Sequence, residues 1–149
     1  ARVAQSCRNT AMAVLIDAGE LNNIHPADKK TVGKRLYLQA LRHVYGRDVA
    51  ADSPRARDAY PEGQTMIVRL NACVTCSGEA ALFEIAGDDG VFYPAAVKLE
   101  GAELQLTAPE VTAPLHARYA WVNYGVVNVF GENGLPLAPF WLRNGAVRG

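Results

Sequence analysis

The chain has 149 residues, and 50% of them are hydrophobic, which is sufficient for one ordinary domain with a real core. Its 15 Lys and Arg residues balance its 15 Asp and Glu residues without a basic cluster, so the electrostatic signature of a protein that binds nucleic acid or an acidic membrane is missing. Three cysteines leave one thiol over in any pairing, which excludes a small disulfide scaffold.

The first part of the chain predicts a strand, a loop and a helix. Residues 1–10 resemble the end of a polar helix, and the apolar run at residues 11–16 is typical of a parallel strand covered on both faces, although it is too short to cross a bilayer. After a loop, Asp28 is a helix N-cap, and Gly46 predicts the end of that helix. We expect its buried face to consist of the apolar residues at four-residue spacing and their neighbours: Val32, Leu36, Ala40, Val44, Tyr37 and Leu41.

The rest of the chain predicts a linker and then an antiparallel β-sandwich. Residues 47–63 are rich in Asp, Pro, Ser, Arg and Ala and show little periodicity, which is typical of a linker or a wrapping loop. Turn residues separate short apolar segments from residue 64 onward, including a predicted turn at Gly87-Asp88-Asp89-Gly90. The predicted strands are 65–71, 80–86, 91–98, 103–107 and 116–123.

These elements define an α+β, mostly β fold in three parts. Residues 1–46 are the remnant of an α/β domain, residues 47–63 the linker, and residues 64–149 the β-sandwich domain. One strand and one helix cannot form a doubly wound sheet, so residues 1–46 either dock on the sandwich or use strands supplied from elsewhere. We expect the chain to be a truncated or processed piece of a longer protein.

A histidine stands between the predicted strand and the capped helix, in the tripeptide Ile24-His25-Pro26. A rigid loop in this position is where a hydrolase keeps its general base. Such a base needs a nucleophile, yet the sequence contains no Gly-x-Ser-x-Gly elbow. The chain therefore predicts the base of a hydrolase without its nucleophile.

Motifs along nearly the whole chain resemble those of the sialate O-acetylesterases of the SGNH hydrolase superfamily. In the N-terminal part the similar segments are residues 9–20, Asn23-Ile24-His25-Pro26-Ala27-Asp28-Lys29-Lys30 and residues 32–36. In the C-terminal half they are residues 83–87, Arg118-Tyr119-Ala120-Trp121-Val122-Asn123, and residues 128–140. The resemblance implies an esterase that removes acetyl groups from sugars.

The same resemblance implies roles for two residues. His25 falls on the general base, which activates a serine expected in sequence that precedes Ala1. Asn23 falls on the position where the family usually has an acid, so either Asp17, Glu20 or Asp28 substitutes for that acid, or the enzyme is slow.

The resemblance also implies a setting for the reaction. The substrate would be an O-acetylated sialic acid or another acetylated glycan, such as acetylated xylan, and neither a metal nor an organic cofactor is needed. The family suggests a periplasmic or secreted protein. The expected protein partner is the missing N-terminal part or a second copy of the chain.

Other candidate residues favour structural roles. His43 lies late in the helix and His116 at the start of a strand, and we expect both to be structural or solvated. Cys73-Val74-Thr75-Cys76 has metal or redox spacing without further ligands, so we interpret the spacing as chance, or as a hairpin disulfide.

The aromatic residues of the last third allow a second function. Core packing explains them, but a sugar-stacking surface is the alternative for Tyr119, Trp121, Tyr124, Phe130, Phe140 and Trp141. We expect Tyr119 and Trp121 to share one face of their strand because side chains alternate. The alternative to the esterase is thus a non-catalytic β-sandwich module that binds glycans or braces another domain.

Overall fold

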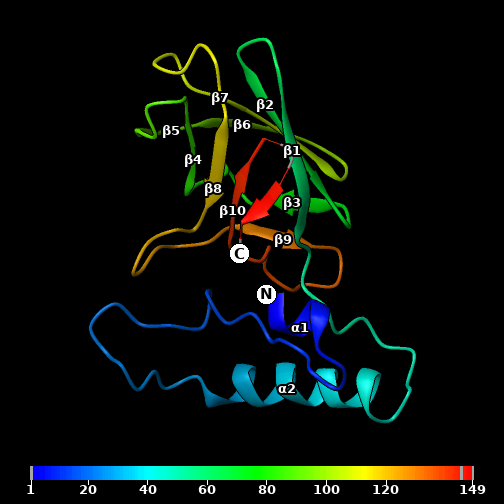
Figure 1. Ribbon diagram of the computed structural model, residues 1–149. Helices are drawn as coiled ribbons and strands as arrows, with labels where there is room; N and C mark the ends of the chain where they lie inside the picture. The colour runs from blue at the N-terminus through cyan, green and yellow to red at the C-terminus, as the bar shows by residue number, and fades with distance from the viewer. Residues whose placement is uncertain (1, 145, 149) are drawn as a thin grey trace.

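The structure is a computed structural model that describes residues 2–144 and 146–148 (Figure 1). Two helices, α1 (Arg2–Ser6) and α2 (Lys29–His43), form the base of the molecule, with the strands above them in Figure 1. Asp28 caps α2 as predicted, because its side chain accepts a hydrogen bond of 2.9 Å from the backbone N–H of Thr31. Gly46 follows with a positive φ of 63°, which suits the end of a helix.

The strands form three antiparallel sheets, and the mostly β fold class is confirmed. The four-stranded sheet has the order β1 (Ala56–Glu62), β2 (Thr65–Leu70), β7 (Glu103–Thr107), β6 (Ala96–Glu100). The five-stranded sheet has the order β11 (Ala146–Arg148), β10 (Phe140–Arg143), β8 (His116–Tyr119), β4 (Phe83–Ala86), β5 (Phe92–Pro94). A small ribbon pairs β3 (Val74–Cys76) with β9 (Val129–Gly131).

One hydrophobic core lies between the two larger sheets. Strands β2 and β7 place Met66, Val68, Leu104 and Leu106 in this core, and the facing strands of the five-stranded sheet supply Ile85, Ala117, Tyr119 and Leu142, all fully buried. Alternation along β7 and β8 sends every second side chain inward, as expected for antiparallel strands with one covered face.

Several predicted strands differ from those observed. Residues 56–62 of the predicted linker form β1, whose pairing with β2 buries Ala59. The predicted strand 91–98 is divided at Ala95, whose N–H donates to the Phe83 carbonyl. The short strands β3 and β9 lacked a sequence signal long enough to predict. The division into domains at residues 46 and 64 stays a prediction.

The predicted strand over residues 11–16 was wrong, because the segment has no regular structure. Its apolar residues are nevertheless needed for packing: Val14 is buried, and Ile16 packs against the core between the sheets. The Arg35 side chain donates to the Val14 carbonyl at 2.6 Å. Burial and a side-chain hydrogen bond thus replace the strand partners that the apolar run predicted.

The expected buried face of α2 was wrong in part, since Val32, Ala40 and Leu41 are only partly buried. Arg35 and Gln39 are the buried residues of this helix, whereas Leu36 and Val44 are 56% and 74% exposed. The polar face lies inward because Arg35 binds the segment before the helix and Gln39 donates to the Ala51 carbonyl at 2.6 Å. No helix in the described part of the chain combines the length and apolarity needed to cross a bilayer.

Candidate active-site loop

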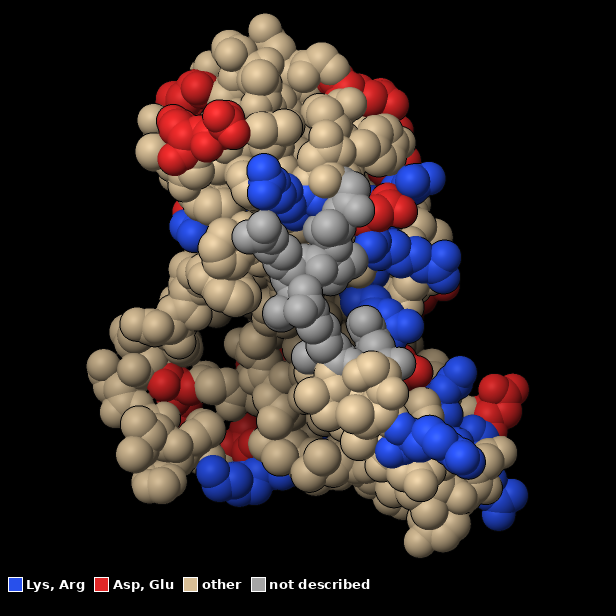
Figure 2. Space-filling view, in the orientation of Figure 1, with Lys and Arg blue, Asp and Glu red and all other residues tan. Residues whose placement is uncertain are grey.

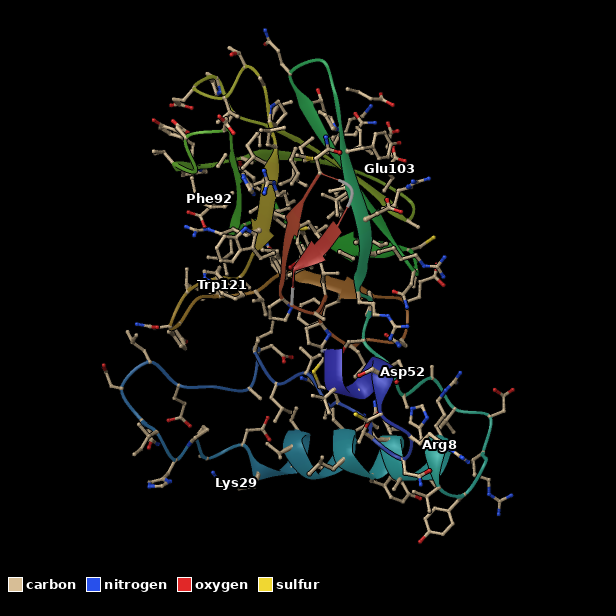
Figure 3. All side chains as sticks on the ribbon, in the orientation of Figure 1. Arg8, Lys29, Asp52, Phe92, Glu103 and Trp121 are labelled. Carbon is tan, nitrogen blue, oxygen red and sulfur yellow. The ribbon has the colours of Figure 1, made fainter. Side chains whose placement is uncertain are left out.

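The loop at residues 17–28 connects the irregular apolar segment to the N-terminus of α2. In Figure 1 this segment extends to the left of the helical base, below the sheets, and Figure 3 labels Lys29 where α2 begins. His25 is exposed in this loop, and Ile24 beside it is 90% exposed. The His25 imidazole makes no hydrogen bond to any other residue that the structure describes, so the ring is open to a hydroxyl from another molecule.

The backbone of His25 is held by the residue expected at the position of the acid. The Asn23 Oδ1 atom accepts a hydrogen bond of 2.9 Å from the His25 N–H, and Asn23 Nδ2 donates to Glu20 Oε2 at 3.0 Å. The other carboxylate oxygen of Glu20 accepts from the Ala27 N–H at 2.6 Å. Asn23 therefore binds the loop backbone and Glu20, and it does not bind the imidazole.

Each carboxylate that we expected to substitute for the acid binds another group. Asp17 forms a bidentate ion pair with Arg35, Asp28 caps α2, and Glu20 closes the loop. The hydrogen bond from Ala27, followed by those from Asn23 and the charge of Lys29, lowers the pKa of Glu20. The hydrogen bonds from Thr31 likewise lower the pKa of Asp28. All three stabilise the loop as anions, and none is bonded to the ring of His25.

The other two histidines lie outside this loop. His43 Nε2 is 3.3 Å from Asp52 Oδ1 at the exposed end of α2. His116 lies at the start of β8, with its ring centroid 6.2 Å from that of Phe92. The structure therefore does not bring these residues together with His25.

The three cysteines carry free thiols, so the hairpin disulfide between Cys73 and Cys76 is not formed. Burial raises the pKa of the Cys76 thiol, which opposes the thiolate that redox or metal chemistry requires. Within the described residues, no group of three or more His, Cys, Asp or Glu side chains is arranged to hold a metal ion.

The expectation that Tyr119 and Trp121 share a face was wrong. Strand β8 ends at Tyr119, and Ala120 has a φ of 51°, which interrupts the alternation of side chains. Tyr119 is fully buried and stacks on Phe83 with ring centroids 4.4 Å apart, whereas Trp121 is 50% exposed. Core packing explains Tyr119, and Trp121 belongs to the surface.

Three aromatic residues form a cluster on the outer side of the five-stranded sheet, which we call the aromatic surface: Phe92, Trp121 and Trp141. Trp141 is edge-on to both neighbours, with centroid distances of 5.9 Å to Phe92 and 5.4 Å to Trp121. Figure 3 shows Phe92 and Trp121 on the same side of the molecule. The Arg118 guanidinium lies 3.9 Å from the centre of the Phe92 ring and forms two hydrogen bonds with Glu84, at 2.6 and 3.0 Å.

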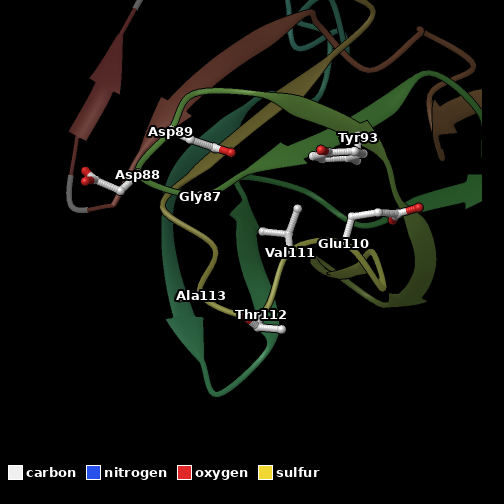
Figure 4. Close-up of a pocket in the computed structure, with 8 residues that line it drawn as sticks. All are labelled: Gly87, Asp88, Asp89, Tyr93, Glu110, Val111, Thr112 and Ala113. Carbon is white, nitrogen blue, oxygen red and sulfur yellow. The ribbon is translucent and has the colours of Figure 1, made fainter.

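A shallow cleft of about 230 Å³ lies beside the turn at residues 87–90 (Figure 4). The turn itself is confirmed, because the Gly90 N–H donates to the Gly87 carbonyl. Two segments line the cleft, as Figure 4 shows: Gly87, Asp88, Asp89 and Tyr93, then Glu110, Val111, Thr112 and Ala113. Its position on the sheets separates it from the His25 loop.

Side chains of both charges lie on the visible face. Figure 2 shows acidic side chains gathered at its upper left, and basic side chains mainly at the right of its middle and at its lower right. This distribution agrees with the neutral balance of the sequence.

The fold resembles part of a carbohydrate acetylesterase of known structure. That protein is XAC1771 from Xanthomonas citri, described as a novel carbohydrate acetylesterase, with 30% sequence identity and a TM-score of 0.83. The match covers 87% of this chain, more than residues 64–149 alone supply, so the likeness extends into the N-terminal part. The chain spans 31% of the length of XAC1771.

Comparisons of sequence alone gave a different result. No family model matches the chain, and no curated protein matches it.

Proposed function

We propose that this chain is the C-terminal part of a carbohydrate O-acetylesterase, with sialate esters as the leading substrates and acetylated xylan or related glycans next. The observation that carries the proposal is the similarity to a carbohydrate acetylesterase over 87% of the chain. The resemblance of the segment around His25 to the sialate O-acetylesterases supports the more specific assignment to the SGNH hydrolases. In this proposal residues 1–46 belong with the α/β catalytic domain, residues 47–63 link the two parts, and residues 64–149 form the second domain.

The proposed reaction is acyl transfer between oxygen atoms. His25 takes the proton from the hydroxyl of a serine supplied by polypeptide outside this sequence, and the serine oxygen attacks the acetyl carbonyl. The protonated imidazole then gives its proton to the sugar oxygen as the ester bond breaks. Water repeats the sequence on the acetyl-serine, which releases acetate and restores the hydroxyl.

The exposed His25 supports this assignment in one respect. The ring nitrogen that takes the proton must be free of competing hydrogen bonds, and the imidazole makes none within the described residues. Asn23 and Glu20 accept hydrogen bonds from the backbone N–H groups of His25 and Ala27, which holds the loop backbone without engaging the ring.

The experiment compares acetate release from acetylated sialic acid and acetylated xylan by three proteins: this chain, the complete protein and its His25→Ala variant. We expect no turnover by the chain, activity of the complete protein, and a loss of at least a hundredfold in kcat for the variant, since a general base contributes roughly that much. His43→Ala is the matched control and should keep its activity. Activity of this chain alone, or an unaffected His25→Ala variant, would contradict the proposal.

A second candidate function rests on the aromatic surface. Trp121 is half exposed, and its ring adjoins Trp141 beside the Arg118–Glu84 ion pair, so apolar ring faces and hydrogen-bonding groups are adjacent, as a glycan requires. Titration of the chain with xylan and sialyl oligosaccharides should then change the tryptophan fluorescence, and Trp121→Ala should abolish the change. Binding together with an unaffected His25→Ala variant would favour this module over the esterase.

A further inference from the structure

Asn23 uses both ends of its carboxamide in the loop. Its oxygen accepts the His25 N–H at 2.9 Å, and its nitrogen donates to Glu20 at 3.0 Å. Glu20 also accepts a hydrogen bond of 2.6 Å from the Ala27 N–H. The side chains of Asn23 and Glu20 therefore hold the backbone at His25 and again two residues later. An isolated bridge between the backbones of Glu20 and Asn23 closes the same turn.

We propose that Glu20 and Asn23 form a relay that positions His25, with Glu20 acting as a positioning residue and Asn23 holding the histidine backbone. This inference rests on the proposed function, since it assigns a role relative to the general base. It differs from the role implied by the family resemblance, in which residue 23 is an acid that binds the imidazole.

The chemistry of the two side chains explains why residue 23 is an amide. A carboxylate at this position has only acceptors, whereas Glu20 requires a donor from its partner. The amide satisfies Glu20 and keeps its oxygen turned toward the His25 N–H. An Asn23→Asp change would place two carboxylates about a hydrogen-bond length apart, and that repulsion would open the turn.

Of the charged residues at the ends of the loop, only Lys29 acts on this relay. Lys29 attracts Glu20, while Asp28 on the far side of Pro26 binds Thr31 and not the relay. Asp17 is held by Arg35. The donors to Glu20 are therefore Asn23 and Ala27, and both come from the loop that the relay closes.

The test uses the 149-residue chain and two substitutions with the same change of charge. Asn23→Asp removes the donor to Glu20, and Asn22→Asp is the matched control, because the Asn22 side chain is exposed and makes no hydrogen bond within the described residues. Amide hydrogen exchange and the imidazole titration of His25 are followed by NMR. Unchanged signals from the strands of the core show that a variant remains folded.

We expect Asn23→Asp to accelerate exchange at the His25 and Ala27 amides by about tenfold, whereas Asn22→Asp leaves both rates unchanged. Neither substitution should create a hydrogen bond to the imidazole, because the residue 23 side chain binds the His25 backbone and Glu20. Glu20→Ala should reproduce the loss of protection at Ala27 and His25. Unchanged exchange in Asn23→Asp and Glu20→Ala would overturn the relay.

A different result would support the role implied by the family. If Asn23→Asp raises the imidazole pKa clearly above that of Asn22→Asp while His25 keeps its protection, then residue 23 faces the ring and the relay is wrong. None of these measurements depends on esterase activity, so a failure of the proposed function, seen as unaffected acetate release by His25→Ala, is distinguishable from a failure of the relay.

Discussion

Arg35 and Asp17 form a bidentate ion pair, in which the two guanidinium nitrogens lie 2.5 and 2.6 Å from the two carboxylate oxygens. The side chains are 10% and 18% exposed, and Arg35 also donates to the Val14 carbonyl. The pair joins α2 to the start of the His25 loop, so it fixes both ends of the loop to one helix. A buried pair of this kind is costly to break from one side, because the remaining charge loses its partner.

Replacing Arg35 by alanine should therefore lower the free energy of unfolding by on the order of 3 kcal/mol, measured by urea denaturation with helical circular dichroism as the signal. The matched control is Arg69→Ala, whose partner Asp58 is 42% exposed and which should have a much smaller effect. Equal effects of the two substitutions would show that burial of the Arg35 pair has no special importance.

Tyr119 provides the second prediction. Its hydroxyl is buried without a hydrogen-bond partner among the described residues, so Tyr119→Phe removes an unsatisfied group and should stabilise the protein by about 1 kcal/mol. Tyr119→Ala should instead cost about 3–5 kcal/mol, because it removes the ring that stacks on Phe83. Thermal unfolding of the two variants gives the comparison, and a destabilised Tyr119→Phe variant would reveal a partner for the hydroxyl.

The same residue gives a pH dependence on the alkaline side. Burial, followed by the charges of Cys76 and Asp17, raises the pKa of Tyr119 well above its ordinary value. The unfolded chain then loses this proton at lower pH than the folded chain, so the stability that Tyr119 contributes is present below pH 10 and is lost as the pH rises further. Tyr119→Phe should reduce this loss, as denaturation at about pH 9 and about pH 11 would show.

Two glycines should respond in opposite directions to alanine. Gly33 lies within α2, and apart from its neighbours in the chain and the local helix backbone no atom lies within 4 Å of the position that a Cβ would take there. Gly33→Ala should therefore stabilise the protein by about 0.5–1 kcal/mol. A Cβ at Gly131 would lie 2.6 Å from Pro54 Cγ, and Gly131→Ala should cost about 1–3 kcal/mol. Thermal unfolding measures both, and a destabilised Gly33→Ala would mean that the exposed face of α2 is in contact with another surface.

The carboxylates of the loop predict a pH dependence on the acid side. The folded-state pKa values of Glu20 and Asp28 are lowered below 4.5 and 3.8, so their contributions are present above those values and are lost as the pH falls through the lower folded-state values. The amides of Ala27 and Thr31, which donate to these carboxylates, should report the two titrations by NMR. Midpoints at the ordinary carboxyl values would contradict these hydrogen bonds.

The local signals of the sequence correctly predicted elements whose ends depend on nearby residues. Asp28 and Gly46 mark the ends of a helix, and alternating apolar residues along 103–107 mark a strand with one covered face. The predicted strand 116–123 is confirmed only over its first half, His116–Tyr119. The same kind of signal predicted the turn before Val91. It failed for β1, since its side chains are mixed in polarity and its pairing with β2 is what makes it a strand.

The position of His25 shows the corresponding limit for the site. Its neighbours in the sequence predicted an exposed loop, but the partners of Asn23, Glu20 and Asp17 depend on how that loop closes on α2. The sequence placed Asp17 and Glu20 near His25 without distinguishing which of them would bind the ring. In the structure neither does: Glu20 accepts hydrogen bonds from Asn23 and Ala27, and Asp17 pairs with Arg35.

The sequence by itself determined the capped helix, about half of the described strands and the mostly β fold class, because caps, turns and alternation act between residues close in the chain. Only the tertiary structure decided that Arg35 and Gln39 face inward while Leu36 and Val44 face outward, and that Val14 is buried without belonging to a strand. The physical reason is that a buried polar side chain is stable only when it has hydrogen-bonding partners. Arg35 finds its partners at residues 14 and 17, and Gln39 at residue 51. These segments meet the helix only when the chain is folded.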